Sequence, residues 1–125
     1  MTNYAMIYNP ADGLKTQTWT GDSYAFLKGA VGGYIEHLCV SDFPDGIDVW
    51  INEDGKYTDM TQSSWLMFRN APYDYTVGNL VFTRVDGEDT VSLTDEDIKA
   101  ITEFFANADY SMALDMEHMV PKLHY

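Results

Sequence analysis

The sequence predicts an α+β fold, with one mostly antiparallel sheet of about five to six strands and two to three helices packed on one face. β-type runs follow one another across turn signals, without the strict alternation with helices that a parallel sheet requires. Two other segments place apolar residues at helical spacing behind a capping residue. The 125 residues are 46% hydrophobic, which is enough for one core, so we expect a single domain over residues 1–125.

The first third of the chain predicts a hairpin followed by a helix. Tyr4–Tyr8 and Leu14–Trp19 are strand-like and flank a turn signal at Asn9–Gly13. Asp22 or Ser23 can cap a helix, whose apolar stripe recurs at positions i, i+3 and i+7. That stripe consists of Tyr24, Leu27 and Val31, and Gly32-Gly33 ends the helix.

The middle of the chain predicts further strands and one short helix. The strands are Tyr34–Val40, Ile47–Asn52 and Thr76–Val85, the last broken at Gly78-Asn79. Between them, Thr61 can cap a helix that runs through Phe68 and ends before Pro72.

The C-terminal part, about residues 94–119, is predicted to be helical. Thr94 caps the clearest helix, and its inward stripe consists of Ile98, Ile101, Phe104 and Phe105. The spacing of Met112, Met116 and Met119 predicts a last amphipathic turn, which we expect to pack on the sheet or on a second copy to form a homodimer. Residues 120–125 read as a short tail.

Composition excludes several classes of partner. With 20 acidic and 7 basic residues the formal net charge is −13, which disfavours direct binding to nucleic acid or an anionic membrane. No apolar run approaches the ~20 residues of a membrane span, and no secretory signal is present. Cys39 is the only cysteine, so no intramolecular disulfide can form. We therefore expect a cytoplasmic protein that acts on a basic partner.

Three short motifs occur in series: Val31–Glu36 (VGGYIE), Asn52–Lys56 (NEDGK) and Tyr75–Asn79 (YTVGN). The series resembles a family of small domains of unknown function carried by phages and mobile elements, over about residues 4–82. One departure is Asp59–Gln62, where such domains usually carry Leu-Pro-x-Asn. The resemblance implies a phage or plasmid context and supplies no catalytic residues.

No motif predicts catalysis, a metal or a cofactor. His37 and Cys39 supply two zinc ligands at most, whereas a structural site needs four. Cys39 has no basic neighbour in the sequence that would activate it, and no phosphate-binding loop occurs. We therefore expect a protein that is not an enzyme.

The acidic excess is the strongest functional signal. Acidic residues at helix starts and turns have ordinary structural explanations. The net charge of −13 still exceeds the magnitude of ≈ 2–8 that suffices to keep a small domain soluble, so solubility alone does not explain the acidic excess. The expected partner-binding acids fall in two tracts: Asp42, Asp48, Glu53 and Asp59, and Asp86, Glu88, Asp89 and Glu96. Closely spaced carboxylates can imitate phosphates, so the leading hypothesis is a DNA mimic that blocks a basic defence protein, of the anti-CRISPR or anti-restriction type.

Two alternatives stay open. Trp50, Asn52, Tyr34 and Trp65 could line a pocket that sequesters a nucleotide-derived immune signal. The chain could also be an accessory protein with no role in defence.

Overall fold

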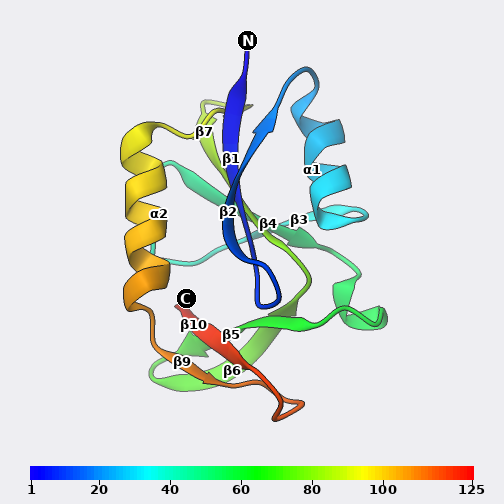
Figure 1. Ribbon diagram of the computed structural model, residues 1–125, viewed down its shortest axis with the longest axis vertical. Helices are drawn as coiled ribbons and strands as arrows, with labels where there is room; N and C mark the ends of the chain where they lie inside the picture. Colours follow the sequence, from blue (N-terminus) through cyan, green and yellow to red (C-terminus); the bar gives the residue numbers. More distant parts are fainter.

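The computed structural model describes residues 1–125 and shows a mostly β protein with ten strands in two sheets and two helices (Figure 1). The predicted α+β fold with two to three helices on one face is therefore wrong, although sheet A does contain the expected antiparallel strands. The elements in chain order are β1 Asn3–Asn9, β2 Gly13–Trp19, α1 Ser23–Val31, β3 Ile35–Leu38, β4 Ile47–Asn52, β5 Gln62–Phe68, β6 Ala71–Val77, β7 Leu80–Asp86, β8 Asp89–Val91, α2 Asp95–Asn107, β9 Tyr110–Met112 and β10 Met119–His124. A 3-10 turn spans Gly55–Tyr57.

Sheet A has the strand order β2-β1-β7-β4-β3, with β8 paired to β7, and every pairing in it is antiparallel. The two helices lie on opposite faces of this sheet (Figure 1). Successive residues of a strand point to opposite faces. Val81 accordingly packs under Leu27 of α1, whereas its neighbour Phe82 packs against Ile101 and Phe105 of α2.

Sheet B has the order β6-β5-β10-β9, and its Leu66 and Leu123 join the α2-side core. The helix expected from Thr61 through Phe68 is absent, because this segment is β5. Ser63 and Ser64 are buried together with Leu66 and Met67, so no period-two pattern marks the strand. The hydroxyls of both serines hydrogen-bond Thr76 Oγ1 on β6, at 2.8 and 2.6 Å, which makes their burial tolerable.

The end of the chain is strand rather than helix and tail. The amphipathic turn expected at Met112, Met116 and Met119 does not form, because Met116 has φ 60° and the three side chains are all exposed. Residues 120–125, expected as a tail, contain most of β10, which pairs in parallel with β5. Val120 and Leu123 are fully buried there.

Several other local predictions are confirmed, but Tyr24, which was expected on the buried stripe of α1, is 49% exposed. β1 and β2 form the expected hairpin, with Asn9 paired to Gly13 at its turn. The Asp22 carboxylate accepts hydrogen bonds from the first turn of α1, and Gly32 ends that helix at φ 81°. Thr94 begins α2 through a reciprocal capping box with Asp97. No helix in the structure is long and apolar enough to cross a membrane.

Candidate functional site: an acidic end of the molecule

One end of the molecule gathers exposed carboxylates from three segments. The β7–β8 hairpin ends in a turn that carries Asp86, Glu88 and Asp89, and Asp86 and Asp89 are paired residues of the ladder. Since like charges directly opposite each other destabilise a hairpin, these positions are unfavourable to the local fold. All three side chains are exposed to solvent.

The start of α2 lies beside this hairpin. The Arg84 guanidinium on β7 donates two hydrogen bonds of 2.6 Å to the Asp97 carboxylate, which fixes the first turn of α2 against sheet A. Asp95 and Glu96 precede Asp97 in that turn and are exposed. The hydrogen bonds from Arg84 hold the pKa of Asp97 below its usual range, against the opposing effect of burial.

The loop before β4 joins the same end. The Val85 amide donates a hydrogen bond of 2.9 Å to the Gly46 carbonyl, which brings Asp45 next to β7. We call the exposed set the acidic end, and it consists of Asp45, Asp86, Glu88, Asp89, Asp95 and Glu96. Asp45 and Asp95 were not among the partner-binding acids expected from the sequence, and no local pattern signals that distant loops meet here.

No basic residue neutralises the acidic end. Arg84 is committed to Asp97, and Lys99 lies 4.0 Å from Glu103 instead of pairing with Glu96. The remaining ion pairs of lysine lie elsewhere, on Asp12, Asp74 and Asp109. The acidic end is therefore a surface of unpaired negative charge.

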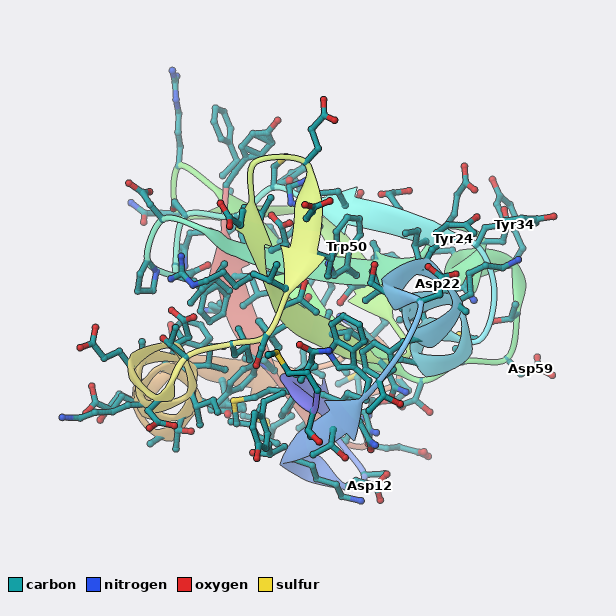
Figure 2. All side chains as sticks on the ribbon, turned by 90° about the horizontal axis from the view of Figure 1, so that it is seen from above. Asp12, Asp22, Tyr24, Tyr34, Trp50 and Asp59 are labelled. Atoms are coloured by element: carbon teal, nitrogen blue, oxygen red, sulfur yellow. The ribbon has the colours of Figure 1, made fainter.

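The other predicted acids are not part of this surface. Asp42 accepts hydrogen bonds from the backbone and ring of His124, at 2.6 and 2.7 Å, so it ties the end of β10 to the loop before β4. Asp48 lies on β4 and accepts a 3.0 Å hydrogen bond from His37 Nε2. Glu53 and Asp59 flank the 3-10 turn at Gly55–Tyr57 and are exposed. Figure 2 places Asp59 on the side of the molecule away from α2.

The residues expected to line a nucleotide pocket do not converge on one cavity. Trp50 donates a 2.8 Å hydrogen bond from Nε1 to Thr83 on sheet A, whereas Trp65 on sheet B donates one to the Met112 carbonyl. Asn52 is buried and donates to the Val31 carbonyl at the end of α1. Tyr34 is 60% exposed and contacts Lys28 (Figure 2).

The Met-rich segment presents an apolar surface on the β9–β10 hairpin. Met112, Leu114, Met116 and Met119 are between 47% and 75% exposed. Packing on a second copy through these residues stays a prediction.

The comparison with known families supplies one match. A model described as a domain of unknown function, DUF3846, matches residues 1–106. The chain belongs to the DUF3846 family. The match extends past residue 82, so it includes all but the last residue of α2 and the whole acidic end, and it stops before β9 and β10, the strands that complete sheet B. No curated protein and no solved structure matches the chain.

Proposed function

We propose that this protein is an acidic, non-catalytic inhibitor that binds a basic, nucleic-acid-binding host protein through the acidic end. The unpaired charge of the β7–β8 turn carries the proposal. Asp86 and Asp89 oppose each other in the hairpin at a cost to stability, and no lysine or arginine offsets it. Residues that destabilise the local structure, with no neighbouring residue to offset the cost, are expected at functional sites.

The clustered carboxylates of the acidic end suit a basic surface on a partner protein that normally binds nucleic acid. The Cβ atoms of directly opposed hairpin residues such as Asp86 and Asp89 lie roughly 5 Å apart. Duplex DNA presents one negative charge per ≈ 1.7 Å of its axis, so a basic surface that binds DNA also attracts a cluster of exposed carboxylates. We infer that the target is an RNA-guided or restriction nuclease and that the protein acts inside a bacterial cell, in a phage or plasmid context.

The test is affinity capture with two variants of equal net charge. Glu88→Lys/Asp89→Lys reverses two charges at the acidic end, and Glu53→Lys/Asp59→Lys reverses two exposed charges beside the 3-10 turn. The immobilised protein is exposed to purified RNA-guided and restriction nucleases at about 50 and 500 mM salt, because salt screens exposed charges. Wild type and the Glu53/Asp59 variant should bind at low salt and release the nuclease in high salt or excess duplex DNA, and the Glu88/Asp89 variant should not bind.

Two results would contradict the proposal. Binding that ignores salt and duplex DNA would exclude a phosphate-mimicking surface. Equal binding by the two variants would show that the acidic end has no special role. The sponge alternative makes a different prediction, because denatured protein should then release an ultraviolet-absorbing small molecule.

A further inference from the structure

A second cluster of reactive side chains lies on the α1-side face of sheet A, outside the acidic end. His37 of β3 and Cys39, two residues further along, project from the same side of the chain, and Asp48 faces His37 from β4. The Cys39 Sγ lies 3.8 Å from His37 Nδ1, and His37 Nε2 lies 3.0 Å from the Asp48 carboxylate. The three groups therefore form a thiol–imidazole–carboxylate chain.

The order of the three groups argues for nucleophile activation instead of metal binding. The imidazole stands between the other two, with one ring nitrogen facing each, so the three side chains do not converge on a common point. No group of three or more metal-ligating side chains in the structure could hold a metal ion. A thiol, a base and a carboxylate that orients the base are the arrangement that activates a cysteine. The His37 ring also packs against the Trp50 ring at an interplanar angle of 63°, with centroids 5.2 Å apart, which restricts the orientation of the imidazole.

The cysteine is accessible and stands at a groove. Cys39 is exposed, and the groove beside it has a volume of about 340 Å³, with a lining that includes His37, Asp48 and Tyr125. Tyr125 continues into an exposed aromatic cluster with Tyr73 and Phe68, at ring separations of 5.7 and 6.0 Å. A small molecule joined to the sulfur could therefore rest its apolar part against aromatic rings.

We propose that Cys39, with His37 as its base and Asp48 as the positioning residue, is a site of covalent modification by low-molecular-weight disulfides. His37 accepts the thiol proton, and the Cys39 thiolate attacks one sulfur of the disulfide. The S–S bond of the small molecule breaks as the new one forms, and the departing thiolate takes the proton from His37. One disulfide and one thiol are consumed, and one mixed disulfide and one small thiol are produced.

The charge of the protein selects among such disulfides. A formal net charge of −13 repels an anionic disulfide and attracts a cationic one at low ionic strength. We therefore expect cystamine, a dication, to modify Cys39 faster than oxidised glutathione, and the difference to shrink in high salt.

The test measures adduct formation by mass spectrometry, and alkylation by iodoacetamide, on the full chain. Because Cys39 is the only cysteine, every adduct reports on this site, and Cys39→Ser should form none. An unassisted thiol is only a few per cent thiolate at pH 7, so His37→Gln should slow both reactions at that pH by about tenfold. Asp48→Asn should slow them less while leaving the fold unchanged.

A pH profile separates activation from mere packing. The titratable groups that face Cys39 are His37 and Asp48 from sheet A, Tyr73 from β6 and Tyr125 after β10. Between pH 8 and pH 7 the alkylation rate should fall less for wild type than for His37→Gln, because only the wild-type thiol has a base beside it. His118→Gln removes a His–Asp pair in the turn between β9 and β10 and serves as the matched control, with no change in rate expected.

The proposal is overturned if folded His37→Gln reacts with iodoacetamide and cystamine at the wild-type rate and with the wild-type pH profile. If His37→Gln does not fold, the same rates and pH profile are measured on Asp48→Asn, and wild-type values for that variant overturn the proposal. Failure of this proposal leaves the proposed role of the acidic end untouched, because Cys39, His37 and Asp48 are not among the residues of the acidic end.

Discussion

The Arg84–Asp97 pair offers the sharpest test of how the acidic end is built. The Asp97 side chain is 4% exposed, accepts both guanidinium bonds, and also accepts the Thr94 amide at 2.9 Å in the capping box. Asp97→Asn keeps the shape and the cap but leaves the Arg84 charge without its partner. Removing one partner of a buried ion pair costs about 3–5 kcal/mol, and because the Arg84 side chain is 30% exposed we expect a smaller loss than that range, about 2–3 kcal/mol.

The assay is urea unfolding followed by far-ultraviolet circular dichroism, with Glu103→Gln as a surface control that should leave the midpoint unchanged. The pKa of Asp97 is lower in the folded state than in the unfolded state, so its contribution is present above the ordinary value of 3.8 and is lost as the pH falls through the folded value. The deficit of Asp97→Asn should therefore be full at pH 7 and shrink below pH 3.8. A loss under about 1 kcal/mol at pH 7, or one that does not change with pH, would refute this reasoning.

Four further predictions concern stability and titration. Leu123→Ala should cost about 2–4 kcal/mol in urea unfolding, because this fully buried residue joins β10 to the core, whereas a mobile tail would lose nothing. Trp50→Phe should cost about 1 kcal/mol through loss of the bond to Thr83, in addition to lost packing, whereas Trp19→Phe should lose packing alone because its buried Nε1 has no partner; a fully stable Trp50→Phe in the same assay would contradict the hydrogen-bond argument. Gly33→Ala should lower the thermal midpoint, because a Cβ there would lie 2.8 Å from Asn52 Nδ2, while Gly29→Ala meets no atom and should not lower it. Burial, with Tyr110 adding to it, raises the pKa of Tyr8 to about 12, so Tyr8→Phe should leave the ultraviolet tyrosine titration unchanged up to pH 11; a lost ionisation below that pH would exclude the buried position.

Local signals in the sequence were sufficient where one residue type determines one conformation. The cap at Asp22, the left-handed Gly32 and the capping box at Thr94 placed both helices correctly, because each depends on contacts within a few residues.

The sequence failed where burial comes from distant segments. β5 is covered on both faces, and β10 reaches it from nearly 60 residues away, so neither strand shows a period of two. The methionine spacing between β9 and β10 imitated a helix only because three exposed residues happened to fall at helical intervals. The mostly β architecture was therefore missed because β5 and β10, which pair with each other, are far apart in the sequence.

The candidate sites could also be predicted only where their residues are close together in the sequence. The β7–β8 acids could be predicted because a turn and a helix start are neighbours in the sequence, whereas Asp45 joins them only through the Val85–Gly46 hydrogen bond. The chain from Cys39 through His37 to Asp48 depends on the β3–β4 register, which pairs His37 with Trp50 and sets Asp48 beside it. No spacing in the sequence specifies that register.

The most direct test of the proposed function is the affinity of one captured nuclease for Glu88→Lys/Asp89→Lys relative to Glu53→Lys/Asp59→Lys at low salt. We expect the acidic-end variant to bind at least about tenfold more weakly than its control, a difference of about 1.4 kcal/mol, and duplex DNA to displace the control. Equal affinities, or a complex that duplex DNA leaves intact, would contradict a nucleic-acid-mimicking surface at the β7–β8 turn.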